Sequence, residues 1–260
     1  MPAGGVSCAE PPVLGPNGGS SPAEASREAA RCGCYHTPVA TEGTGERPAA
    51  SSVAGADWLA DRLPAADSPQ WQRLEAGLRQ LGAVDRAVYR AIASVPTPAL
   101  DEPIRRLSRA ADNSRLWLAI AAALAITGGS AGRRAAVRGV LSIGVTSAVV
   151  NLGIKSVYTR RRPDRAGAGV PGERHVRMPG STSFPSGHSA SAFAFASAVG
   201  RDLPGLALAL NFLATAVAYS RVHTGVHYPG DTIVGAAIGA STALTVSAVV
   251  DRYQDAHPGS

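Results

Sequence analysis

Three short groups of polar residues, each at the end of a long apolar run, carry the side-chain types that phosphate chemistry requires. They are, in chain order, Lys155 with Arg162-Pro163, then Pro185-Ser186-Gly187-His188, and then Ser220-Arg221 with His227 and Asp231. If the apolar runs are helices packed side by side, the three groups meet on one side of the bundle. Cations, two histidines and a carboxylate are the inventory needed to hold a phosphate ester and break it. The pattern predicts this chemistry at a membrane.

The second group predicts a helix N-terminus that faces an anion. Ser186 is a suitable N-cap, so the backbone N–H groups of the first turn would point out of the bundle toward a bound phosphate. Gly187 lets the backbone approach that anion closely, and His188 lies in the same turn. Taken alone, the group is equally typical of a capped helix with an interfacial histidine.

The third group spans the turn between the last two apolar runs. Asp231 follows His227 by four residues, and a carboxylate bonded to one ring nitrogen fixes the tautomer and raises the basicity of the other. His223 competes for the same role, but His227 is preferred because it has the acidic neighbour downstream. The alternative is a turn in which Asp231 only caps the last helix.

The first group contains the only lysine of the chain, Lys155, among 25 Lys and Arg residues. Six residues separate Lys155 from Arg162, and Pro163 ends any helix there. Both cations would therefore be held at the membrane surface. Alone this signal is weak, because basic residues flank most membrane segments.

Five apolar runs must position these groups. They are residues 116–132, 137–154, 186–199, 203–219 and 232–250. None has Asp, Glu or Lys in its interior, and runs of about 17 to 19 residues reach most of a ~30 Å hydrocarbon core. We expect an all-α fold, a multi-pass helical bundle of about five transmembrane helices over residues 116–250, in the cell membrane. A soluble bundle with alanine-rich helices is the alternative.

The flanking segments differ in composition from this core. Residues 1–56 are rich in Gly and Pro and poor in large apolar side chains, which predicts a disordered tail. Residues 57–115 form an amphipathic lead-in whose second short helix, 101–109, suits the headgroup layer. Residues 251–260 are a short polar tail. Cys8, Cys32 and Cys34 lie in the tail, and their odd number predicts no disulfide framework.

The net charge of +6 predicts attraction to anionic partners. The apolar runs favour lipids over nucleic acid, so membrane lipids and a lipid phosphate substrate are the expected partners. After Lys155, Arg162 and Arg221 are set aside, nine basic residues remain on the side of the three groups and five on the other. The positive-inside rule would then place the groups in the cytoplasm.

Together the three groups resemble the signature of the type-2 phosphatidic acid phosphatase superfamily, from Lys155 to Asp231. The resemblance implies that His227 attacks phosphorus, that His188 protonates the departing alkoxide and later activates water, and that Asp231 orients His227. It also implies a phosphate site with no metal and no cofactor. The phosphate-binding residues it implies are Lys155, Arg162, Ser186, Gly187 and Arg221.

Several questions stay open at the level of sequence. The family usually has six spanning helices and an active site that faces outward, whereas the charge distribution of this chain predicts a site that faces the cytoplasm. The superfamily also contains vanadium haloperoxidases, and a non-catalytic membrane anchor would explain the helices alone. Phosphatidic acid, phosphatidylglycerol phosphate, polyprenyl diphosphate and a polyprenyl phosphosugar phosphate all fit as substrates.

Overall fold

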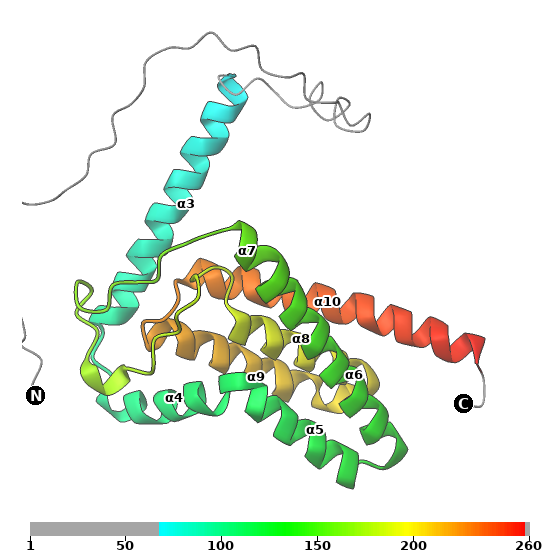
Figure 1. Ribbon diagram of the computed structural model, residues 1–260. Helices are drawn as coiled ribbons and strands as arrows, with labels where there is room; N and C mark the ends of the chain where they lie inside the picture. The colour runs from blue at the N-terminus through cyan, green and yellow to red at the C-terminus, as the bar shows by residue number, and fades with distance from the viewer. Residues whose placement is uncertain (1–67, 258–260) are drawn as a thin grey trace, which may run out of the picture. The chain divides into compact units, whose positions relative to one another are not determined.

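The computed structural model describes residues 68–257, which form helices and connecting segments with no strand in that range (Figure 1). The long helices are α3 (Pro69–Ser94), α4 (Pro98–Ala110), α5 (Arg115–Thr127), α6 (Gly129–Ala148), α8 (Gly187–Asp202), α9 (Pro204–His223) and α10 (Pro229–Ala256). The predicted tail 1–56 with its cysteines, and the start of the lead-in, lie outside the described residues. Their properties stay predictions.

The five apolar runs correspond to α5, α6, α8, α9 and α10, but several boundaries differ. Helix α10, for example, continues to Ala256 and so includes part of the predicted polar tail. The first run was expected to continue to residue 132, but α5 ends at Thr127 and α6 begins at Gly129. Two glycines make this turn possible. A Cβ on Gly128 would lie 2.7 Å from the carbonyl oxygen of Leu124, and Gly129 has a φ of +60°. The segment expected to link the two runs is therefore part of α6.

Within residues 68–257, three helical segments are long and apolar enough to cross a membrane. They are Gly129–Val157, Pro204–His223 and Pro229–Ala256. The first continues from α6 through a π-helical turn, η2 (Val149–Ile154), into the short α7 (Lys155–Val157). Helices α5 and α8 have 13 and 16 residues, fewer than the ~20 that a span requires. The all-α membrane-type bundle is confirmed, and the number of five spans stays a prediction.

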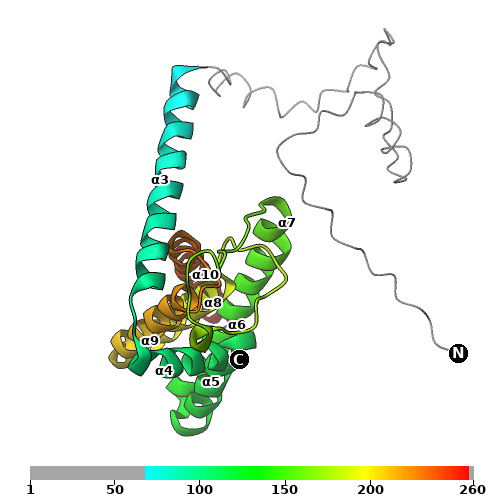
Figure 2. The same ribbon diagram turned by 90° about the vertical axis from the view of Figure 1, so that its left-hand side faces the viewer.

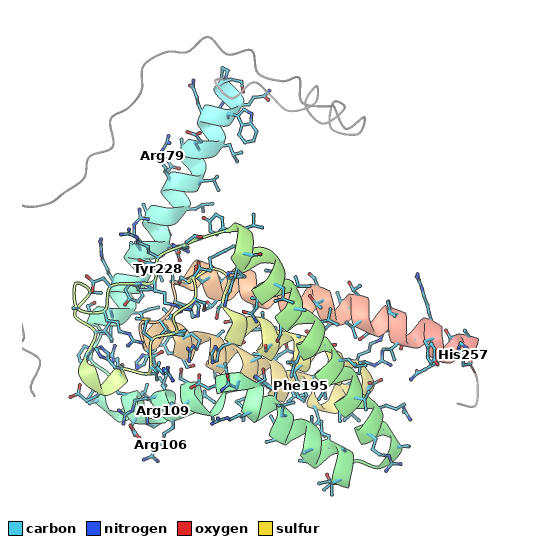
Figure 3. All side chains as sticks on the ribbon, viewed as in Figure 1. Arg79, Arg106, Arg109, Phe195, Tyr228 and His257 are labelled. Carbon is cyan, nitrogen blue, oxygen red and sulfur yellow. The ribbon has the colours of Figure 1, made fainter. Side chains whose placement is uncertain are left out.

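Helix α8 is the central element of the bundle. It packs against α6, α9 and α10, and in Figure 2 it lies among them. Ala190, Ala194 and Ala198 are fully buried, so neighbouring backbones approach α8 closely. Phe195, labelled in Figure 3, lies in the core, and the centroid of its ring is 5.5 Å from that of the Trp117 ring. A short helix surrounded by other helices does not need the length of a lipid-exposed span.

Helices α8 and α10 touch through glycines of α10. A Cβ on Gly239 would lie 2.1 Å from the carbonyl oxygen of Ala190, and a Cβ on Gly235 would lie 2.5 Å from that of Ser186. The backbone N–H of Ser186 donates to the carbonyl oxygen of Asp231 at 2.9 Å. This contact joins the second and third polar groups at the same end of the bundle.

A buried arginine joins three helices at the end of the bundle opposite the polar groups. Arg138 of α6 is 4% exposed and lies 2.9 Å from a carboxylate oxygen of Asp202 and 2.7 Å from one of Asp251. These carboxylates stand at the ends of α8 and α10. The ion pairs thus fix three helices to one another away from the predicted site.

Helices α3 and α4 pack beside the end that carries the polar groups. Between them, fully buried Arg174 donates to Asp101 at 2.9 Å and to the carbonyl oxygen of Val95 at 2.5 Å. Tyr89 of α3 meets Tyr228 edge-on, with ring centroids 5.4 Å apart. An apolar stripe on α3 is exposed, which fits the expected amphipathic helix; its residues are Leu74, Leu78, Leu81, Val84 and Val88. Placement of residues 101–109, which belong to α4, in the headgroup layer stays a prediction.

We expect Gly239→Ala to destabilise the bundle by about 1–3 kcal/mol, because the new methyl group overlaps the backbone of α8. Thermal unfolding of the detergent-purified protein measures the change. Gly144→Ala on α6 is the matched control, since a Cβ there meets nothing within 4 Å. Equal unfolding temperatures for the two variants would contradict the close α8–α10 contact.

Candidate active site

A cavity of about 450 Å³ lies where the end of α6, the start of α8 and the turn before α10 converge. Five of the predicted site residues line it: Lys155, Arg162, Gly187, His188 and His227. The other three, Ser186, Arg221 and Asp231, are buried and do not line the cavity. Asp231 lies beside His227, which does. All three polar groups of the sequence therefore contribute to one site.

His227 is 2% exposed and has a different partner at each ring nitrogen. Its Nδ1 lies 3.5 Å from a carboxylate oxygen of Asp231, and its Nε2 lies 3.3 Å from Nη1 of Arg162. Burial lowers the pKa of His227 to about 4, although the neighbouring carboxylate of Asp231 opposes the shift. The imidazole is therefore neutral at pH 7, and Nε2 is the nitrogen on the side of Arg162.

Asp231 is a fully buried carboxylate held by three donors. Arg160 donates at 2.7 Å, the hydroxyl of Ser183 at 2.5 Å and the backbone N–H of Tyr228 at 3.0 Å. The last bond caps the start of α10, as the sequence predicted. Asp231 is thus both a helix cap and the neighbour of His227, so the two readings of the third group are not alternatives.

Arg160 was not predicted as a site residue, yet it connects Asp231 to α3. Its second guanidinium nitrogen donates to Asp85 of α3 at 2.6 Å, and the guanidinium lies 4.3 Å from the ring centroid of Tyr228. Asp85 also accepts from the backbone N–H of Gly230 at 2.7 Å. Arg160 stands in a run of three arginines, and nothing in the sequence marks it out from its neighbours.

His188 is paired with a carboxylate that the sequence analysis missed. Its Nε2 lies 2.8 Å from Oδ1 of Asp112, which belongs to the turn η1 (Asp112–Ser114) between α4 and α5. The hydrogen bond with His188 holds the pKa of Asp112 below its ordinary value, against the effect of burial. The available signal was a carboxylate just before the first apolar run, on the side where the three groups were expected.

Arg221 also lies close to the carboxylate of Asp112. Its Nη1 donates to the hydroxyl of Ser108 at 2.6 Å and lies 3.7 Å from Oδ1 of Asp112. Arg221 is 1% exposed, so any effect on a ligand passes through Asp112 and His188 in this arrangement. This differs from the direct phosphate contact that the sequence analysis expected.

The two cations that face the cavity come from the first polar group. The Nζ of Lys155 lies 3.8 Å from the position of a Cβ built on Gly187, so the ammonium stands over the first turn of α8. Arg162 is held by the carbonyl oxygens of Ser181 and Val226 at 2.9 and 2.8 Å. Ser186 caps α8 by accepting from the N–H of Ser189 at 3.4 Å.

His223, the competing histidine, lies elsewhere. Its Nε2 is 3.0 Å from Asp101, beside buried Arg174, and it does not line the cavity. Geometry therefore favours His227. Within residues 68–257, no cluster of three His, Cys, Asp or Glu side chains is placed to hold a metal ion. The predicted independence of a metal and of a cofactor stays a prediction.

The arrangement can bind a tetrahedral anion between two cations and two imidazoles. One imidazole is neutral and presents Nε2, as a nucleophile or base requires. The other, His188, is bonded to Asp112, which favours its protonated form, although burial lowers the pKa of His188 below its ordinary value. Such a pair can attack an electrophilic centre and protonate a leaving group.

The sequence of this chain is similar to those of known phosphatases. Residues 135–255 match the PAP2 superfamily. The chain is 43% identical over 98 residues to decaprenylphosphoryl-5-phosphoribose phosphatase of Mycobacterium tuberculosis, covering 38% of this chain and 50% of the relative. The chain thus spans about half the length of that relative. It is 33% identical over 156 residues to the protein of the same name from Mycolicibacterium smegmatis, covering 59% of this chain and 79% of the relative.

A solved structure has a similar fold. It is a transmembrane PAP2-type phosphatidylglycerolphosphate phosphatase from Bacillus subtilis, with a TM-score of 0.52 and 22% identity, covering 72% of this chain and 90% of that one. At this identity the likeness concerns the fold alone. The match to residues 135–255 and the extent of the similarity to the M. smegmatis relative establish that the chain belongs to the PAP2 superfamily.

Proposed function

We propose that the chain is a membrane phosphatase that hydrolyses a phosphate monoester or diphosphate of a polyprenyl-linked lipid through a phosphohistidine. One observation carries the proposal. Two histidines, each beside its own carboxylate, face one cavity together with Lys155 and Arg162. A phosphate ester needs a nucleophile, an acid and cations around its non-bridging oxygens, and each is present here.

Substrate binding begins with charge neutralisation. Lys155 and Arg162 would contact the non-bridging oxygens, and the N–H groups at the start of α8 would add donors next to Gly187. In this structure, Nη1 of Arg162 lies 3.3 Å from Nε2 of His227. An incoming phosphate would take over that donor and free the lone pair of Nε2 for attack.

In the first chemical step, Nε2 of His227 forms a bond to phosphorus while the bond to the lipid oxygen breaks. Asp231 would orient the ring and stabilise the positive charge that develops at Nδ1. The leaving oxygen takes a proton from His188. In the second step, His188 accepts a proton from water, the water oxygen bonds to phosphorus, and inorganic phosphate leaves as His227 regains its lone pair.

Asp112 would act on His188 as Asp231 acts on His227. Because Asp112 occupies Nε2 of His188, Nδ1 is the ring atom left for proton transfer. The negative charge of Asp112 favours the protonated ring that the first step requires, and Arg221 holds this carboxylate in place. Asp112 is therefore a positioning residue and not a group that touches substrate.

The lipid assignment rests on the relatives. Both curated relatives carry a name that specifies a decaprenyl-linked phosphate. A bundle with three helices able to cross a membrane would receive such a tail laterally, beside the cavity. We therefore favour a polyprenyl-linked substrate over phosphatidic acid, and we place the protein in the cell membrane as a multi-pass protein.

We expect the detergent-purified protein to release phosphate from polyprenyl-linked phosphates in EDTA. His227→Ala should lower the rate by roughly 10⁴-fold or more, because the covalent step is lost. Vanadate should inhibit the wild-type protein. Vanadate-dependent halide oxidation would instead indicate a haloperoxidase, and no effect of vanadate together with no phosphate release would indicate a membrane anchor.

Asp112→Asn should lower kcat by roughly 10- to 100-fold for an alkyl phosphate, because His188 becomes a poorer acid. The loss should be much smaller for an aryl phosphate, whose leaving group needs little protonation. Comparison of kcat for the two substrates measures this effect. The matched control is Glu102→Gln, since Glu102 pairs with Arg106 on α4 and does not line the cavity. An equal loss on both substrates would show that Asp112 has only a structural role.

The acid limb of the pH profile should lie well below pH 6.5. His227 must be neutral to attack, and burial lowers its pKa to about 4, so protonation removes the nucleophile only as pH approaches that value. The measurement is kcat/KM of the free enzyme against pH, corrected for the second ionisation of the substrate phosphate. An acid limb that stays near 6.5 after this correction would contradict a buried, neutral nucleophile.

A further inference from the structure

The amino-terminal half of α3 carries large apolar side chains that stay uncovered in the structure. Leu78 and Leu81 are 59% and 67% exposed, and both belong to the α3 stripe, which consists of Leu74, Leu78, Leu81, Val84 and Val88. We propose that the α3 stripe lies on the phospholipid surface of the membrane, at the level of the active site. This contact goes beyond the chemistry of the site and can be tested without turnover.

The carboxyl-terminal half of α3 fixes the orientation of the helix on the bundle. Asp85 accepts from Arg160 at 2.6 Å and from the backbone N–H of Gly230 at 2.7 Å. One turn later, Tyr89 packs against Tyr228. The face of α3 that carries Asp85 is therefore the face that meets the bundle.

The α3 stripe lies on this same face. Leu81 stands four residues before Asp85 and Val88 stands three residues after it, and residues at these spacings are neighbours on one face of a helix. Leu78 is one further turn toward the N-terminus. Arg79 points to the other side of α3, away from the bundle (Figure 3). The α3 stripe thus continues the bundle-facing side of α3 beyond the edge of the bundle.

Helix α3 runs across the bundle and not along it. In Figure 2, α10 is strongly foreshortened because it points along the line of sight, whereas α3 stands upright in both views. Helix α10 is one of the segments able to cross a membrane, and α3 is not among them although it has 26 residues. A helix that lies across the end of a spanning helix runs parallel to the membrane plane.

An apolar groove joins the α3 stripe to the outer surface of α9. The groove has a volume of about 320 Å³ and lies between the two helices, with Val88 and Tyr219 among its lining residues. Tyr219 is 44% exposed and lies one turn before α9 ends at His223, on the side of the active site. Because tyrosine is enriched where spanning helices meet the headgroups, Tyr219 marks the expected level of the membrane surface. The α3 stripe reaches this level through the groove.

The charges of α3 suit headgroup phosphates. The helix contains four arginines and two acidic residues. Asp85 is paired with Arg160, and Glu75 is paired with Arg79 at 3.2 Å, so positive charge prevails on the polar side of α3. Interfacial helices combine such a basic face with an apolar face buried about 5–10 Å into the boundary between headgroups and acyl chains. A second copy of the chain would bring two basic helices together, which repulsion between like charges opposes.

The test measures the depth of a fluorescent label on single cysteines, with the full chain in lipid nanodiscs. The three native cysteines are first replaced by serine, and Leu78→Cys, Arg79→Cys and Phe212→Cys are then labelled in separate proteins. The quenchers are phospholipids that carry a spin label either just below the headgroup or near the end of the acyl chain. Phe212 is the reference for a deep position, because it is 77% exposed near the middle of α9.

We expect the shallow spin label to quench the fluorescence of Leu78→Cys strongly and that of Arg79→Cys little, although the two positions are adjacent in sequence. The deep spin label should quench Phe212→Cys more than Leu78→Cys. Leu81→Cys is a second position on the α3 stripe and should behave as Leu78→Cys does. Agreement between the two stripe positions excludes a local effect of one label.

Equal quenching of Leu78→Cys and Arg79→Cys, or quenching of neither, overturns the inference. Stronger quenching of Leu78→Cys by the deep spin label would place α3 across the membrane and overturn it as well. Disulfide formation between two Leu78→Cys chains, without quenching, would identify a second copy as the occupant in place of lipid. An unquenched Phe212→Cys would contradict the membrane-spanning bundle itself. None of these measurements depends on whether the protein is a phosphatase.

Discussion

The structure depends on one buried carboxylate, Asp231. It receives hydrogen bonds from Arg160, from Ser183 and from the backbone of Tyr228, and it lies beside Nδ1 of His227. Its backbone oxygen accepts from Ser186 at the start of α8. A carboxylate removed from water is stable only when its oxygens are well bonded. The groups that satisfy this demand also bring the first, second and third polar groups together.

Close helix packing makes this arrangement possible. Small residues on α8 and α10 let the two backbones meet, so the N-terminal ends of both helices lie at one cavity. Arg138, Asp202 and Asp251 hold the other end of the same helices. The site is thus built on rigid elements, while His188 and His227 stand at helix ends and line the cavity. Precise placement of this kind is what electrostatic stabilisation of a reacting phosphate requires.

Much of this was predictable from residue type and spacing. Apolar runs located the helices of the bundle, Ser186 was expected as the cap of α8, and Asp231 was expected beside His227. These features depend on neighbours within a few residues, which a sequence displays directly. The α5–α6 boundary was misplaced because Ser130, Ala131 and Gly132 are uncharged and were counted with the apolar run, although the turn at Gly128 and Gly129 precedes them.

The partners of the site residues were not predictable, for a physical reason. Asp112 meets His188 across 76 positions of sequence, and Arg160 meets Asp85 across 75. Such pairs depend on how the helices pack, and the periodicity of a short stretch of sequence does not show which helices pack together.

The central claim is that His227 carries the phosphoryl group. The most direct test is rapid acid-free quenching of the wild-type protein with a ³²P-labelled lipid phosphate, followed by identification of the labelled peptide. The account predicts an acid-labile, alkali-stable label on the peptide that contains His227, and no label in His227→Ala. A label on another residue, or steady turnover by His227→Ala at the wild-type rate, would contradict it.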